Sequence, residues 1–205
     1  MTEKQDRLIS LDAFRGATIA LMILVNNPGT WAHVYAPLRH AKWHGCTLTD
    51  LVFPFFLFIV GVSMRFSFEK YDFSKWGPLF RKVFNRSITI FVIGLLLNAF
   101  PFVRQDWDWS HFRVMGVLQR IAFAYFFASF IVAPSDIKRI VKISVALLVG
   151  YWLLLSSYGW YTGLDPYALK SNLTLVVDSL IIGSNHLYGG MGIPFDPEGL
   201  LRTIP

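Results

Sequence analysis

The sequence contains a single cysteine, Cys46, among its 205 residues. One cysteine excludes an intrachain disulfide and argues against a metal site built from cysteines. Charged residues are also few, at 16%, whereas hydrophobic residues make up 54% and the mean hydropathy is +0.47. This composition is too apolar for a typical soluble domain. We therefore expect one integral membrane domain over residues 1–205.

Five apolar blocks are long enough to cross a bilayer. Each holds roughly 17–22 residues, about the helix length that ~30 Å of hydrocarbon requires. Such segments must be helical in lipid, because every backbone polar group needs a partner within the chain. The predicted fold is an all-α polytopic helix bundle with about five spans, and a sixth is expected to start at the C-terminal end. The five blocks are 11–27, 47–68, 87–103, 114–133 and 140–158.

Lysine and arginine are distributed unevenly between these blocks. Twelve lie in the N-terminal segment, the loop after the second block and the turn before the fifth, against six on the opposite flanks. By the positive-inside rule the twelve face the cytoplasm, so the N-terminus is expected inside. All five histidines then fall on the outer side. This bias explains the net charge of +6, so no nucleic-acid partner is expected.

The segment RHAKWHGC, residues 39–46, places titratable groups directly before the second block. His40 and His44 would share a face if the segment were helical, and with His33 they could bind a metal. A histidine here is otherwise a general base, or simply a residue at the headgroup level. Asp50 lies about one turn into the block, where it either stabilises the helix N-terminus or lines a functional cavity. The residues alone leave these alternatives open.

Arg120 lies inside the fourth block, beside Gln119. An unpaired arginine in mid-helix costs at least ~2.5–3.5 kcal/mol on insertion scales, so Arg120 is expected to have a partner. One alternative is a structural ion pair with Asp50 or Asp12. The other is a phosphate or carboxylate of a ligand, which the guanidinium fork suits. Asp12 itself is three residues from Arg15, and an ion pair is expected there.

Five segments of the chain carry a resemblance to a known family. Together, from Arg7 to Pro205, they resemble the catalytic membrane region of the heparan-α-glucosaminide N-acetyltransferase family. The resemblance implies a polytopic enzyme that moves an acetyl group from cytoplasmic acetyl-CoA, as co-substrate, to an amino sugar or glycan on the far side of the membrane. In chain order the segments are RLISLDAFRGATIALMILVNNPG, HAKWHGCTLTDLVFPFFLFIVG, FRVMGVLQRIAFAYF, VVDSLIIGSNHLYG and FDPEGLLRTIP.

The resemblance also implies roles for single residues. The histidine of the family's H-A-x-W-x-G motif is regarded as catalytic, and it corresponds to His40. His44 falls at a variable position of that motif, so no metal is expected. Asn26 matches an asparagine that ends the preceding helix, and it is expected to stabilise the tetrahedral oxyanion. Asp50 is expected to orient His40.

Further residues are expected to hold the two substrates. Arg120, with Gln119 beside it, would bind the phosphates of acetyl-CoA. In the outer tail, the carboxylates of a glycine- and proline-rich segment would attract an ammonium sugar, although ordinary loop chemistry explains them equally well. The expected acceptor-binding residues are Asp178, His186, Asp196 and Glu198.

The chain also departs from the family pattern. Further spans follow the D-P-E-G motif in the family, so the domain is expected to be incomplete at its C-terminus. No lumenal N-terminal domain is expected, as in a prokaryotic member, so the expected location is the bacterial inner membrane. The expected partners are the bilayer and the acceptor, with a homo-oligomer as one possible assembly. A transporter or glycan-export component without transferase activity is the rival interpretation.

Overall fold

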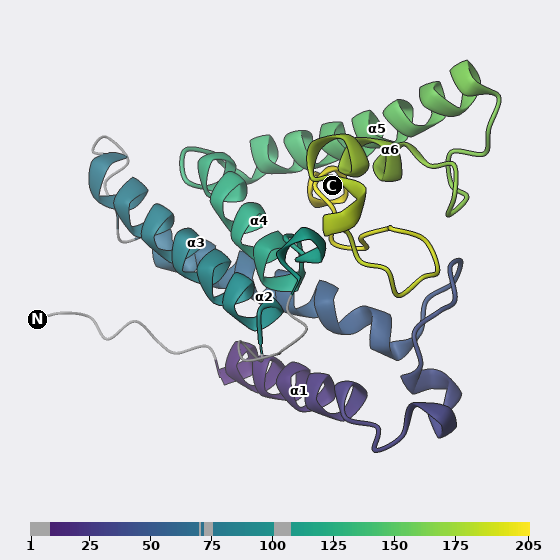
Figure 1. Ribbon diagram of the computed structural model, residues 1–205. Coiled ribbons are helices and arrows are strands. Elements are labelled where there is room, and N and C mark those ends of the chain that lie inside the picture. Colours follow the sequence, from purple (N-terminus) through teal and green to yellow (C-terminus); the bar gives the residue numbers. More distant parts are fainter. Residues whose placement is uncertain (1–8, 70, 72–75, 101–107) are drawn as a thin grey trace, which may run out of the picture. The chain divides into compact units, whose positions relative to one another are not determined.

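The computed structural model describes residues 9–69, 71, 76–100 and 108–205. It confirms the predicted all-α fold, since the described residues form helices and no strand (Figure 1). The chain divides into two compact units, Met1–Ser67 and Phe68–Pro205. The α-helices are α1 (Ile9–Asn26) and α2 (Leu48–Phe68), then α3 (Trp76–Asn98), α4 (Val117–Val132), α5 (Ile137–Thr162) and α6 (Leu173–Ile181).

Helices occur at all five predicted blocks, but three of them meet the requirements for a membrane span. Helices α1, α2 and α5 are long and apolar enough to cross a bilayer, whereas α4 is apolar but has only 16 residues. Helix α3 begins at Trp76, well before the predicted residue 87, so its first turns carry Arg81 and Lys82. These lengths and hydropathies indicate an integral membrane protein. At the C-terminal end, where a sixth span was expected to start, Leu201–Thr203 forms one 3-10 turn.

Some residues used in the predictions lie outside the described part of the chain. They are the last three residues of the third block, 101–103, and five basic residues of the charge count, Lys4, Arg7, Lys70, Lys75 and Arg104.

Helices α1 and α2 belong to the first unit and are joined by an arginine. Arg15 forms the predicted ion pair with Asp12, with Nη1 3.1 Å from Oδ1. Its Nη2 also donates to the Ser63 hydroxyl of α2 at 3.0 Å. Phe14 packs edge to face against Phe55, with ring centroids 5.4 Å apart. A polar contact and an aromatic contact therefore hold the two helices together.

Helices α3 and α4 lie side by side in the second unit (Figure 1). Phe84 contacts Phe126 and Phe91 contacts Phe123, with ring centroids 6.5 and 5.6 Å apart. The two helices approach closely at Gly94, where an added Cβ would lie 2.7 Å from Gln119 Oε1. Glycine permits this approach, as small residues commonly do between membrane helices.

Gly94→Ala is therefore expected to destabilise the second unit by about 1–3 kcal/mol, the usual cost of overpacking. Gly61→Ala in α2 is the matched control, because nothing lies within 4 Å of its added Cβ. The free energy of unfolding in detergent, measured for both variants, checks the prediction. Equal stability of the two variants would contradict it.

Helix α6 is an element that the hydropathy pattern does not predict, because its nine residues are too few for a span. Asn172 caps it: the side-chain Oδ1 accepts a hydrogen bond from the Leu175 N–H at 2.8 Å. The same oxygen also accepts from the Thr174 hydroxyl. This N-cap before an apolar run was the available sequence signal.

Candidate active site

A histidine–aspartate pair stands at the start of α2. His40 Nδ1 lies 2.7 Å from Asp50 Oδ1. The carboxylate can only accept, so Nδ1 carries the proton and Nε2 is the basic nitrogen of the neutral ring. The His40 side chain is 67% exposed and that of Asp50 27%. The ring is thus oriented by a carboxylate on one side and open to a reactant on the other, which is the arrangement of a general base.

The carboxylate of Asp50 is fixed by the backbone at the beginning of α2. Its Oδ2 accepts hydrogen bonds from the N–H and the hydroxyl of Thr47, both at 2.9 Å, and from the Ala41 N–H at 3.2 Å. An acidic side chain that reaches back to the N–H three residues earlier is one half of a capping box. Asp50 therefore caps the helix with one oxygen and contacts His40 with the other.

The other candidate site residues of the first unit, His44 and Asn26, are not part of the hydrogen-bonded pair of His40 and Asp50. Residues 40–46 are not helical, so His40 and His44 do not share a helical face. Among the described residues there is no group of three or more His, Cys, Asp or Glu side chains that could hold a metal. Asn26 is the exposed last residue of α1, and the neighbouring Asn27 amide donates to the Ile23 carbonyl at 2.8 Å.

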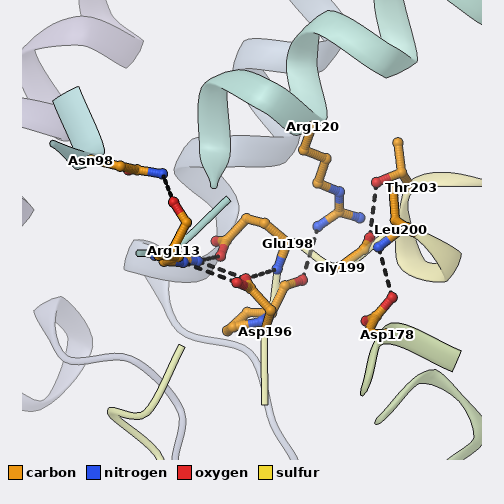
Figure 2. Close-up of polar contacts among 10 residues, drawn as sticks. Asn98, Arg113, Arg120, Asp178, Asp196, Glu198, Gly199, Leu200 and Thr203 are labelled. Atoms are coloured by element: carbon orange, nitrogen blue, oxygen red, sulfur yellow. Dashed lines mark hydrogen bonds and ion pairs between the residues drawn. The ribbon is translucent and has the colours of Figure 1, made fainter. Parts of the chain in front are cut away.

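The second unit gathers most of the predicted substrate-binding residues around the D-P-E-G motif (Figure 2). Arg113 binds Asp196 through two parallel hydrogen bonds, Nε to Oδ2 at 2.9 Å and Nη2 to Oδ1 at 2.6 Å. Its Nη2 also lies 2.5 Å from Glu198 Oε2. The Tyr188 ring lies 4.8 Å from the same guanidinium. A bidentate pair of this kind is among the stronger protein hydrogen bonds.

The two carboxylates of this cluster differ in accessibility. The Asp196 side chain is fully buried, whereas that of Glu198 is 21% exposed. Burial raises the pKa of Glu198, the Arg113 charge opposes this, and Asp196 adds to the rise. Within this triad Glu198 is the carboxylate that a ligand can reach.

Arg120 joins the same region through backbone carbonyls. Its Nη2 donates to the Arg202 carbonyl at 2.7 Å, and Nη1 lies 3.5 Å from the Pro197 carbonyl. Asp12 and Asp50 were considered as ion-pair partners of Arg120. The Asp12 carboxylate contacts Arg15, and the Asp50 carboxylate contacts His40. Arg120 therefore holds the segment that carries the D-P-E-G motif.

Gln119 is buried beside Arg120, with 1% of its surface exposed. Its Nε2 has no hydrogen-bond partner among the described residues. A buried amide donor without a partner costs about 1–3 kcal/mol, so it calls for a water or ligand acceptor.

Asp178 is buried and fixes the backbone that follows the motif. Its Oδ1 accepts from the Leu200 N–H at 3.0 Å. Burial raises its pKa, and the Leu200 hydrogen bond opposes the rise. A Cβ added at Gly199 would collide with the Asp178 carboxylate, so a larger residue there would displace it.

His186 connects the tail to the segment before α4. Its Nδ1 lies 2.8 Å from the Phe112 carbonyl oxygen, which can only accept, so the ring nitrogen donates. The Val114 N–H in turn lies 3.4 Å from the His186 carbonyl. His186 therefore has a structural contact as well as a partly exposed ring.

Arg113 is a residue of this cluster that the sequence does not single out, since it is one of the six basic residues of the outer flanks. Its partners lie 83 and 85 residues away in the sequence. The available signal was its position immediately before an apolar block, where a basic residue is expected to find an anionic partner.

Comparison with known proteins identifies relatives over almost the whole chain. The family model described as "Heparan-alpha-glucosaminide N-acetyltransferase, catalytic" matches residues 7–173. The human protein named heparan-alpha-glucosaminide N-acetyltransferase is 30% identical, with 97% of this chain and 36% of the relative covered. The mouse protein of the same name is 29% identical, with 97% and 37% covered. The chain thus spans little more than a third of the length of these relatives.

Proposed function

We propose, because this chain belongs to the heparan-alpha-glucosaminide N-acetyltransferase family, that it is a membrane-embedded N-acetyltransferase. The donor is acetyl-CoA and the acceptor is the amino group of a sugar or glycan. The observation that carries the proposal is the hydrogen-bonded pair of His40 and Asp50, which leaves Nε2 of an exposed imidazole available as a base. Transfer to an amine requires such a base, because an ammonium group is not nucleophilic.

In the proposed reaction His40 Nε2 removes a proton from the acceptor ammonium. The free amine then attacks the thioester carbonyl and forms a C–N bond. The nitrogen loses its extra proton to solvent, the C–S bond breaks, and the leaving thiolate takes up the proton held on Nε2. In a two-step variant Nε2 first takes the acetyl group and then passes it to the amine. In both routes Asp50 stabilises the positive imidazole, and the Asn26 amide donates to the oxyanion.

Two groups of the second unit are proposed to contact the substrates. Arg120 is proposed to contact a donor phosphate, because the planar guanidinium fork suits phosphate oxygens. The unpartnered Nε2 of Gln119 supplies a further donor. On the acceptor side, Glu198 is the accessible carboxylate of the triad and is proposed to accept a hydrogen bond from an ammonium ligand. His186 lies on the same tail, while Asp178 and Asp196 act by holding that tail in place.

The proposed orientation has the N-terminus in the cytoplasm and residues 39–46 on the opposite side, in a bacterial inner membrane. It rests on the distribution of basic residues and predicts accessibility. A cysteine introduced at Lys138 is expected to react with an impermeant maleimide from the cytoplasmic side, and one at Lys170 from the other side. The labelling is done in a Cys46→Ser background. The reverse labelling would overturn the orientation.

The activity is tested with membranes that contain the protein, radiolabelled acetyl-CoA and glucosamine. Labelled N-acetylglucosamine is the expected product. Glucose is the matched control acceptor, because a hydroxyl replaces the amine, and it should remain unlabelled. A transporter or export component without transferase activity would give no labelled sugar above membranes that lack the protein, and that result would reject the proposal.

A further inference from the structure

A groove between α3 and α4 has no part in the proposed chemistry. It encloses about 190 Å³, and its lining is apolar apart from one hydroxyl. The α3 side presents Phe84, Ser87, Ile88 and Phe91, and Phe123 and Phe127 are among the residues on the α4 side. Phe84, Ile88 and Phe127 are 46%, 46% and 60% exposed. Large exposed apolar side chains around a groove indicate a surface that is covered by an apolar partner.

One end of the groove is positively charged. Its α3 residues are spaced i, i+3, i+4 and i+7, so they form one face of the helix. Three residues before Phe84 on that face is Arg81, which is exposed. Arg86 extends the charge toward α4, where its guanidinium lies 4.9 Å from the Tyr125 ring. The occupant should therefore have an anionic end as well as an apolar body.

The single hydroxyl of the groove adds a hydrogen-bond requirement. Ser87 is 8% exposed, and its Oγ has no hydrogen-bond partner among the described residues. Thr89 in the same helix behaves differently, because its hydroxyl donates to the Asn85 carbonyl at 2.7 Å. Ser87 is six residues beyond Arg81, about 9 Å along the helix axis. An acceptor is thus expected between the charged end and the apolar part of the occupant.

We propose that the α3–α4 groove binds an anionic phospholipid, an interaction separate from the proposed acetyl transfer. Its phosphate lies at Arg81, an ester carbonyl accepts from the Ser87 hydroxyl, and an acyl chain follows Ile88 and Phe91. Trp76 stacks on Phe130 at the charged end, with ring centroids 6.2 Å apart. Tryptophan is enriched at the level of the lipid headgroups, which agrees with a headgroup at this end. Charge complementarity favours an anionic lipid over a zwitterionic one.

The full chain with Phe127→p-benzoylphenylalanine, reconstituted in nanodiscs of equimolar phosphatidylglycerol and phosphatidylcholine, tests the proposal. Irradiation is expected to give lipid adducts in which phosphatidylglycerol predominates. Arg81→Gln should reduce this preference about five-fold, the effect of one basic residue near a membrane surface. Ser87→Phe should reduce the yield of both adducts, because its ring fills the groove.

Lys138→Gln is the matched control, since it removes the same charge from α5, outside the groove. It should leave the preference unchanged, and equal losses in Lys138→Gln and Arg81→Gln would overturn the proposal in favour of general surface attraction. Adducts with protein rather than lipid would overturn it as well, by showing that another polypeptide covers the groove. An unchanged far-UV circular dichroism spectrum and melting temperature establish that Arg81→Gln and Ser87→Phe remain folded. If Ser87→Phe fails to fold, the ratio of adducts in Arg81→Gln alone decides.

Discussion

His40→Ala is expected to lower the turnover of acetyl transfer by about 10²–10⁴-fold, the usual contribution of a general base. This range corresponds to about 2.7–5.4 kcal/mol of activation free energy. The affinity for acetyl-CoA should stay within a few-fold of the parent, because His40 acts on the acceptor amine. Initial rates over a range of donor concentrations, together with equilibrium binding of acetyl-CoA, measure both quantities.

Two variants accompany His40→Ala and separate catalysis from local structure. His44→Ala is the matched control, since His44 lies four residues away in the same exposed loop and has no part in the proposed reaction. Asp50→Asn should lower turnover because an amide stabilises the positive imidazole less well, and also weaken the start of α2. A His40→Ala enzyme with turnover close to that of the parent would remove the assignment of the base. Equal, zinc-reversible losses in His40→Ala and His44→Ala would point to a metal site.

Arg113→Met is expected to destabilise the second unit by about 3–5 kcal/mol, because it removes the partner of a buried carboxylate. Asp196 is 1% exposed and receives two hydrogen bonds from Arg113. Without the guanidinium, Asp196 must either stay ionised in an apolar environment or take up a proton. The free energy of unfolding in detergent, followed by circular dichroism, measures the loss.

Arg86→Met provides the comparison for Arg113→Met, because Arg86 is exposed and its guanidinium contacts the Tyr125 ring. It should cost about 1 kcal/mol or less. The double variant Arg113→Met with Asp196→Asn should recover part of the stability, because it removes the uncompensated charge. If Arg113→Met were no less stable than Arg86→Met, the triad would not hold the C-terminal segment.

Local sequence patterns predict the parts of the structure that depend on residues close to one another in the sequence. Apolar blocks predict five of the helices because burial in lipid depends mainly on composition. The pair of Asp12 and Arg15 follows from a spacing of three. The contact of His40 with Asp50 can also be anticipated, because the two residues are ten positions apart, on either side of the start of α2.

The features that the sequence did not reveal depend on longer separations or on helix ends. Arg113 meets Asp196 across 83 residues, and no periodicity within a single sequence indicates that pairing. Helix α3 starts about three turns before its apolar block. These first turns carry basic residues, so a prediction from hydropathy alone leaves them out. Helices α1, α2 and α5 are long and apolar enough to span a membrane. Helix α4 is apolar but has 16 residues, and the first turns of α3 carry basic residues.

The central claim is that an acetyl group passes from acetyl-CoA on one side of the membrane to an amino sugar on the other. Sealed vesicles of known orientation, with radiolabelled acetyl-CoA on the cytoplasmic face and glucosamine on the opposite face, test it most directly. We predict labelled N-acetylglucosamine on the glucosamine side, at a rate that falls at least about 100-fold in His40→Ala. No product, or product that forms only when both substrates are on the same side, would contradict the account.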